Sequence, residues 1–242
     1  MNNLHKQKLL WEVKIRNIES HYKKFMAISD FPKYKINFMN IIPGGRLAAE
    51  VNHTKSPMEL NVLIGMMATK EHNLQATLFH EFTHILDYSK ANQNDDILNS
   101  KVSLRLYSEY HASYIEGLYL IGTENISIKP TQINKEAIRN FLNKNKYLIY
   151  ESIAFYNEEK SIAKWYDVLD AYMYYYASVS LCNEYLKEQT ELTEFDFPCD
   201  ENLKHLYYCY NIEPLVFGKN ISDISCRITT FLHQYAINDI DC

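Results

Sequence analysis

The pentapeptide His80-Glu81-Phe82-Thr83-His84 places two imidazoles four residues apart, with a carboxylate directly after the first of them. On an α-helix, residues four apart lie on one face about a turn from each other, so both imidazoles can hold one metal ion. Zinc in catalytic sites takes three protein ligands and leaves a place for water, whose pKa falls toward about 7. The H-E-x-x-H spacing therefore predicts a Zn2+ site with His80 and His84 as ligands and Glu81 as general base.

The residues around this motif predict the helix that it requires. The run Glu71–Ser89 contains no proline or glycine, and Thr69 or Asn73 can cap its start. Apolar or small residues recur in it at spacings of three and four, namely Leu74, Ala76, Thr77, Leu78, Phe79, Phe82, Ile85 and Leu86. The polar residues of the motif, joined by Asp87, form a stripe bordered by that apolar surface. We expect this stripe to face an interior cleft.

A third ligand must come from a later part of the chain. Glu109 lies in the run Val102–Leu120, which also reads as a helix, and the small Ala112 and Ser113 share its face and allow a close approach to the histidine helix. Glu116 lies seven residues after Glu109 on the same face, so it is the alternative ligand. Helix geometry favours Glu109 of the two.

Two other polar side chains near the motif are weaker candidates for direct contact with the ion. Asp87 lies one turn beyond His84 on the same helix, so orienting an imidazole suits it better than binding the metal. His111 points away from the face of Glu109 and is interpreted as a surface or core histidine.

The segment His80–His84, followed by Glu109 and Ala112 as an E-x-x-A pattern, resembles the gluzincin metallopeptidases and is nearest to the IrrE/ImmA-like type. The resemblance covers roughly Lys35–Leu120. It implies that Glu109 completes the zinc site and that a peptide or protein substrate is hydrolysed. The metzincin pattern is excluded, because Lys90 occupies the position of its third ligand.

The segment before the motif predicts a small sheet, and the whole chain an α+β fold. Three short strands are expected at Tyr34–Ile42, Leu47–Thr54 and Leu60–Met67, with turns between them that contain proline, glycine or serine. In zincins the edge strand of this sheet pairs with extended substrate. By position we expect Asn61–Met66 to be that strand, with Asn61, Val62, Leu63 and Ile64 as the substrate-binding residues. An ordinary buried strand is the alternative.

After Leu120 the chain becomes mainly helical. A loop is expected at Gly122–Asn134 and an acidic loop at Glu191–Glu201. The expected helices are Lys135–Asn157, Ser161–Leu186, Asn202–Tyr210 and Ile221–Ala236. We therefore predict a zincin-like metallopeptidase core at residues 1–122 and a helical extension packed on it at 123–242, or one continuous domain of both.

Composition excludes several classes of function. The 242 residues carry a net charge of −5 with scattered basic residues, which argues against nucleic acid as a partner. No apolar run approaches the roughly 20 residues that span a bilayer, and Met1–Trp11 lacks a signal-peptide core, so we expect a cytoplasmic protein without a membrane partner. The five cysteines form no C-x-x-C pair and are expected to be reduced. Oligomeric state is left open.

Zincins often use a tyrosine to stabilise the oxyanion that forms during attack on a carbonyl. No spacing rule selects among the candidates here, which are Tyr107, Tyr110, Tyr114, Tyr150, Tyr156 and Tyr172. The leading functional hypothesis is a zinc metallopeptidase. The alternative is a non-catalytic regulatory or partner-binding protein on the same scaffold, although retention of Glu81 counts against it.

Overall fold

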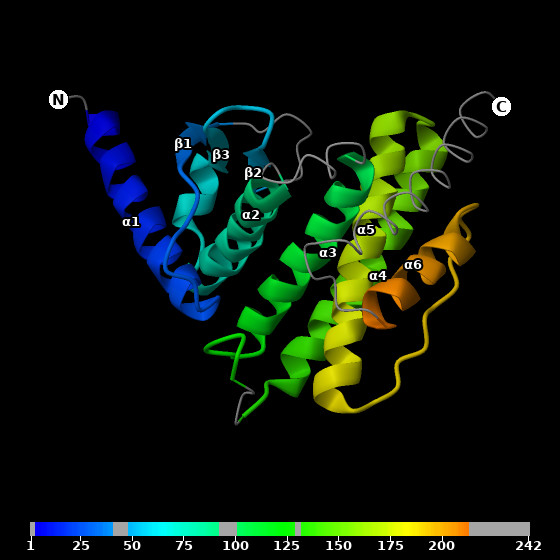
Figure 1. The fold of residues 1–242 in the computed structure, drawn as a ribbon. Helices are drawn as coiled ribbons and strands as arrows, with labels where there is room; N and C mark the ends of the chain where they lie inside the picture. Colours follow the sequence, from blue (N-terminus) through cyan, green and yellow to red (C-terminus); the bar gives the residue numbers. More distant parts are fainter. Residues whose placement is uncertain (1–2, 41–47, 92–100, 129–131, 213–242) are drawn as a thin grey trace.

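The computed structural model describes residues 3–40, 48–91, 101–128 and 132–212, and within these ranges the fold is α+β and mostly helical (Figure 1). The predicted α+β class is thus confirmed. In chain order the elements are α1 (Asn3–Phe25), β1 (Tyr34–Met39), β2 (Ala49–Asn52), β3 (Met58–Leu63), the 3-10 helix η1 (Ile64–Ala68), α2 (Glu71–Ala91), α3 (Lys101–Leu120), α4 (Lys135–Glu158), α5 (Ile162–Leu181), the π-helix η3 (Cys182–Leu186) and α6 (Asp200–Ile212).

The three strands form one mixed sheet in the order β1-β3-β2. β3 pairs in parallel with β1 and antiparallel with β2, so both of its edges are occupied. Leu60 and Val62 of β3 are fully buried and lie on the face that packs against helices. On the opposite face Asn61 donates to Glu50 and accepts from Asn37, both at 3.0 Å, which ties the three strands together.

Helices α1 and α2 pack against each other and against the inner face of the sheet. The ring centroid of Trp11 in α1 lies 5.4 Å from that of Phe38 in β1. The hydroxyl of Tyr22 in α1 shares a 3.0 Å hydrogen bond with Thr83 in the middle of the H-E-x-x-H segment. Because Tyr22 and Thr83 are both fully buried, this contact fixes the rotation of α2 about its axis relative to α1.

Helix α3 lies between α2 and α5, and it joins the sheet half of the molecule to the helical half (Figure 1). A first hydrophobic cluster contains α1, the sheet, α2 and part of α3, and a second contains α3, α4, α5 and α6. A Cβ atom at Gly117 of α3 would overlap Leu181 of α5 and lie 2.9 Å from Phe141 of α4. The absence of a side chain there therefore lets α3 approach both helices, and α3 can bring residues from both halves close to the H-E-x-x-H segment.

Sequence patterns located the helices that follow the sheet well. The predicted helices at Glu71–Ser89, Val102–Leu120 and Lys135–Asn157 correspond to α2, α3 and α4 within two residues at each end. The predicted helix at Asn202–Tyr210 is α6. The one expected at Ser161–Leu186 is α5 followed by the π-helix η3, and Ser161 is its N-cap. The expected helix at 221–236 lies outside the described residues.

Two predictions for the N-terminal part are wrong, and one helix was missed. The strands are shorter than expected, and Ile64–Ala68 forms the 3-10 helix η1 instead of continuing β3. β3 is the central strand and not an edge strand, so Asn61, Val62 and Leu63 cannot add a substrate strand through main-chain hydrogen bonds. Helix α1 was not predicted, although it buries Ile15, Ile18 and Tyr22 in the core.

None of the helices in the described part combines the length and apolar character needed to cross a bilayer.

Candidate metal centre

Helix α2 positions His80 and His84 on a face opposite its best-buried apolar residues, and Glu81 lies about 100° around the helix from His80. Leu78 and Phe82 are fully buried in the core, whereas His80 and His84 are 9% and 7% exposed. The two imidazoles contact each other edge to face, with centroids 4.8 Å apart. The apolar side of α2 thus holds the helix in the core and presents both imidazoles to α3.

Glu109 of α3 lies opposite the two imidazoles. Its Oε2 atom is 3.5 Å from Nε2 of His80 and 3.4 Å from Nε2 of His84. These three side chains offer one ligand atom each, and the ligand atoms all lie within 4.8 Å of one another. The structure therefore brings together the ligand set that the sequence analysis favours.

This arrangement fits a zinc ion by its donor chemistry, and the carboxylate lies from each imidazole at the spacing of zinc ligands. Two imidazoles and one carboxylate are a usual donor set for a catalytic zinc with one position left for water. Bonds of about 2.0–2.2 Å to a tetrahedral ion separate neighbouring donor atoms by roughly 3.3–3.6 Å. The distances of 3.5 Å and 3.4 Å from Glu109 to the imidazoles fall within that interval.

Glu116, the alternative ligand, lies on the other side of His80. Its Oε2 atom is 3.2 Å from Nδ1 of His80, close enough for an ionic contact, although the N–H direction does not make an aligned hydrogen bond. A proton on Nδ1 that faces Glu116 leaves the lone pair of Nε2 directed toward Glu109. Glu116 is therefore placed to orient His80 rather than to bind the same ion.

Asp87 orients His84 through an intervening hydroxyl. Nδ1 of His84 lies 2.7 Å from Oγ of Ser108, and Ser108 donates to Oδ2 of Asp87 at 3.1 Å. Because Asp87 and Ser108 are fully buried, neither group exchanges these bonds for water. His111 also contacts Asp87, with Nδ1 3.0 Å from both carboxylate oxygens. The sequence predicts an orienting role for Asp87, but it does not predict any part in the site for Ser108 or His111.

The site also contains a tyrosine that the sequence analysis did not name. Tyr174 of α5 donates a 3.0 Å hydrogen bond to Oε2 of Glu109, and its ring lies 5.6 Å from that of His80. Among the tyrosines that were named, Tyr110 bonds to Ser180 and Tyr172 donates to Asp200. No spacing rule relates α5 to the motif on α2, so Tyr174 is identified by the fold alone.

A partly buried ion pair lies beside the candidate ligands on the side of α5. Arg105 lies one turn before Glu109 on α3 and donates two hydrogen bonds to Asp170 of α5, at 3.2 Å and 2.6 Å. The guanidinium carbon of Arg105 lies 4.9 Å from the ring centroid of Tyr166, so the guanidinium is held on two sides. This pair ties α3 to α5 beside the candidate ligands.

Burial and close charges shift the protonation of these groups strongly. Burial alone would lower the pKa of His80, but Glu109 and Glu116 outweigh it and raise that pKa to about 10. Burial raises the pKa of Glu81 to about 7, although the neighbouring imidazoles oppose the change. Burial alone would raise the pKa of Glu109, whereas His84 and His80 hold it well below its usual value. In the absence of a metal ion, the site is thus a cluster of protonated imidazole and carboxylate.

In comparisons with protein-family models, curated proteins and solved structures, nothing matches this chain.

Proposed function

We propose that this protein is a zinc-dependent metallopeptidase with a gluzincin-like site in which His80, His84 and Glu109 bind the ion. The observation that carries the proposal is the approach of one carboxylate oxygen of Glu109 to both imidazoles at the spacing of tetrahedral zinc ligands. Zinc, when bound, supplies the Lewis acidity that activates a water molecule for attack on a peptide carbonyl.

Glu81 is the general base of the proposed reaction. It is 6% exposed and follows the first ligand on α2, so helix geometry rotates its carboxylate by about 100° from His80. Burial raises the pKa of Glu81 to about 7. A carboxylate whose pKa is near neutrality accepts a proton from the attacking water and returns it to the leaving amine efficiently.

Tyr174 is the proposed donor to the oxyanion. Its hydroxyl lies at Glu109, on the α5 side of the candidate ligands, and its ring contacts that of His80. A hydroxyl at this place is positioned to leave Glu109 and donate to the carbonyl oxygen as negative charge develops there. Burial raises the pKa of Tyr174 well above its usual value, so the hydroxyl keeps its proton at neutral pH.

The proposed substrate strand adds to β2 and not to β3. The amide of Leu63 donates to the carbonyl oxygen of Ala48 at 3.0 Å, which makes these residues a hydrogen-bonded pair of the antiparallel ladder. The pairs alternate along the ladder, so the main-chain groups of Ala49 and Val51 point away from β3. In the described part no further strand pairs with β2, so a substrate strand can bond to these groups.

The position of β2 beside the active-site helix supports this assignment. β2 packs on α2, and His53, directly after β2, stacks on Tyr88 with ring centroids 4.1 Å apart. Tyr88 lies one turn beyond His84 on α2. A peptide that extends β2 would therefore run along the side of α2 that carries the candidate ligands.

The test combines metal analysis with a single substitution. We expect the purified protein to hold one zinc per chain and to cleave members of a mixed peptide library, as followed by mass spectrometry. Glu81→Gln should keep the zinc and slow cleavage by about 100-fold or more. Glu71→Gln, at an exposed position on the same helix, is the matched control and should leave the rate unchanged.

Either of two results would refute the proposal. One is protein that takes up no zinc when it is added to the folded chain. The other is a Glu81→Gln variant that cleaves the same peptides at the wild-type rate. Zinc binding without cleavage of any peptide would instead favour a non-catalytic binding protein on this scaffold.

A further inference from the structure

Helix α1 has a second apolar surface in addition to the one that it buries. Trp11, Ile15, Ile18 and Tyr22 face the core, yet Leu9, Leu10 and Val13 are 46%, 63% and 59% exposed. Successive residues of an α-helix are rotated by about 100° about its axis. The exposed residues on the side of α1 that faces away from the core therefore fall within a sector about 100° wide. We call this sector the outer stripe; it contains Lys6, Leu9, Leu10, Val13, Asn17, Ser20 and Lys24.

The outer stripe is basic and contains no acidic residue. α1 carries six lysines and arginines against two glutamates, although the whole chain has a net charge of −5. Both glutamates lie outside the stripe, and Glu19 is held by Arg16 at 2.8 Å and by the hydroxyl of Tyr34 at 2.7 Å. Among the described residues no carboxylate pairs with Lys6 or Lys24. The stripe therefore carries two positive charges, those of Lys6 and Lys24, and no negative charge on one edge of an acidic protein.

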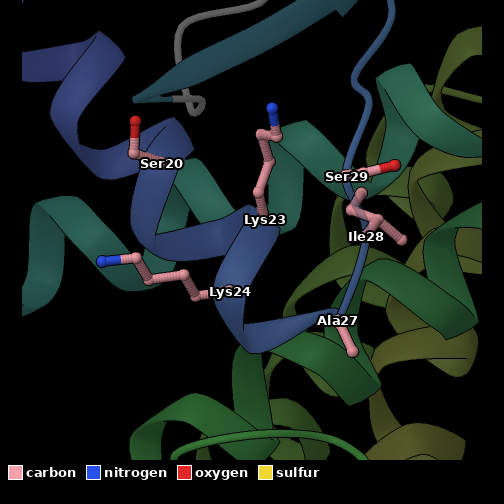
Figure 2. A pocket seen from close by; sticks show the side chains of 6 residues that line it. All are labelled: Ser20, Lys23, Lys24, Ala27, Ile28 and Ser29. Atoms are coloured by element: carbon pink, nitrogen blue, oxygen red, sulfur yellow. The ribbon is translucent and has the colours of Figure 1, made fainter.

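The C-terminal end of the stripe opens into a hollow where the chain leaves the helix (Figure 2). Its lining residues are Ser20, Lys23, Lys24, Ala27, Ile28 and Ser29, and none of them is acidic. Figure 2 shows Lys23 and Lys24 projecting from α1 in different directions, so they do not converge on one enclosed anion. Such an arrangement suits several separate phosphate groups on a flat surface better than a single bound phosphate.

The shape and charge of the stripe favour a planar anionic partner over a second copy of the chain. α1 lies at the outer edge of the molecule in Figure 1, and from Lys6 to Lys24 the stripe is roughly 27 Å long. A symmetric pair of stripes would run antiparallel and would bring Lys6 of one copy against Lys24 of the other, which is repulsive. A bilayer surface instead offers phosphates to both ends and an apolar layer to the middle.

We propose that the outer stripe of α1 docks the protein on the surface of an anionic lipid bilayer, with Leu9, Leu10 and Val13 entering the headgroup boundary. Lys6 and Lys24, joined by Lys23 at the hollow, contact the lipid phosphates. The expectation of no membrane partner rested on the lack of a spanning segment, and docking from one side needs none. The inference is independent of the proposed catalytic function, because the stripe contains none of the candidate site residues.

The test is flotation of the full-length protein with lipid vesicles. Vesicles of phosphatidylcholine with about one quarter phosphatidylglycerol should carry the protein, whereas vesicles of phosphatidylcholine alone should not. Binding should weaken in about 1 M salt, where the Debye length is about 3 Å. Lys6→Gln with Lys24→Gln should weaken binding roughly 30-fold, and Leu9→Ser, Leu10→Ser and Val13→Ser together by at least about 10-fold.

Matched variants on other helices test whether vesicle binding depends on the outer stripe or on exposed lysines and apolar residues anywhere on the protein. Lys135→Gln with Lys144→Gln removes two exposed lysines of α4, and Tyr147→Ser with Ile162→Ser removes apolar residues that are 66% and 58% exposed. Both should bind as the wild type does. Equal losses in these controls would overturn the proposal, and so would equal binding to neutral vesicles. A stripe variant that converts a dimer to a monomer, as measured by light scattering, would overturn it in favour of self-association.

Discussion

Nδ1 of His84 is held 2.7 Å from the hydroxyl oxygen of Ser108, a residue that the sequence does not connect with the metal motif. Since Ser108 donates its own proton to Asp87, its oxygen is left to accept from a proton on Nδ1 of His84. The tautomer that results directs the lone pair of Nε2 toward Glu109. A neutral hydroxyl thus transmits the orienting effect of a buried carboxylate to one of the two imidazoles.

Removal of this hydroxyl should weaken metal binding without dismantling the site. In Ser108→Ala the imidazole of His84 loses its fixed tautomer and rotation, so we expect zinc affinity to fall by about 10–100-fold, as measured by competition with a chelator. Ser178→Ala is the control, because Ser178 is also fully buried but bonds only to the carbonyl oxygen of Tyr175 on its own helix. An unchanged affinity in Ser108→Ala would show that the hydroxyl has no orienting role.

Substitutions of the two glutamates of α3, Glu109 and Glu116, should differ clearly in their effects on zinc affinity. Glu109→Gln removes the carboxylate that faces both imidazoles, so its loss of affinity should exceed about 100-fold. Glu116→Gln removes only the contact with Nδ1 of His80, and the expected loss is about 10–100-fold. Chelator competition on both variants measures the order directly. The reverse order would mean that Glu116 is the ligand and that Glu109 is its supporting partner.

Tyr174→Phe should affect the rate of cleavage more than the binding of zinc. Loss of an oxyanion donor typically lowers kcat by about 100–1,000-fold, whereas the ligand set remains. Tyr172→Phe is the control two residues away, because the hydroxyl of Tyr172 donates to Asp200 on the other side of α5. If Tyr174→Phe instead lost zinc and kept kcat on the remaining loaded enzyme, Tyr174 would act only as a support for Glu109.

How much of this site the sequence predicts depends on how locally each feature is encoded. The imidazole pair follows from a spacing of four on one helix, and Glu109 from the pattern of the next helix. Tyr174 comes from α5, far away in the chain, and only the packing of α3 against α5 places its hydroxyl at Glu109. Likewise, Ser108 directly precedes Glu109 in the sequence, yet only the packing of α3 against α2 brings the Ser108 hydroxyl into contact with His84.

The sheet was harder to predict because strand order is not a local property. Alternating residues identify β3, but its position before α2 led to the prediction of an edge strand, whereas β3 pairs with a strand on both sides. In the structure Asn61 is only 8% exposed, because Asn37 and Glu50 satisfy its amide from both sides. A buried polar ladder across three strands therefore looks like a solvent-facing strand when it is read from one segment alone.

The stability of the metal-free protein should decrease as the pH rises above neutrality. Glu109 and Glu116 outweigh burial and raise the pKa of His80 from 6.5 to about 10, so the folded state binds this proton more tightly than the unfolded state. The stabilisation is fully present below pH 6.5 and is lost as the pH rises through about 10. Its magnitude is on the order of a few kcal/mol.

Urea unfolding of chelator-treated protein across this interval measures the loss, and His80→Gln should remove most of the dependence of stability on pH. Zinc should abolish this dependence in the wild type, because the ion takes the place of the proton on Nε2. A metal-free protein whose stability is constant or increases between pH 6.5 and 10 would show that His80 does not carry the proton that its two carboxylate neighbours favour.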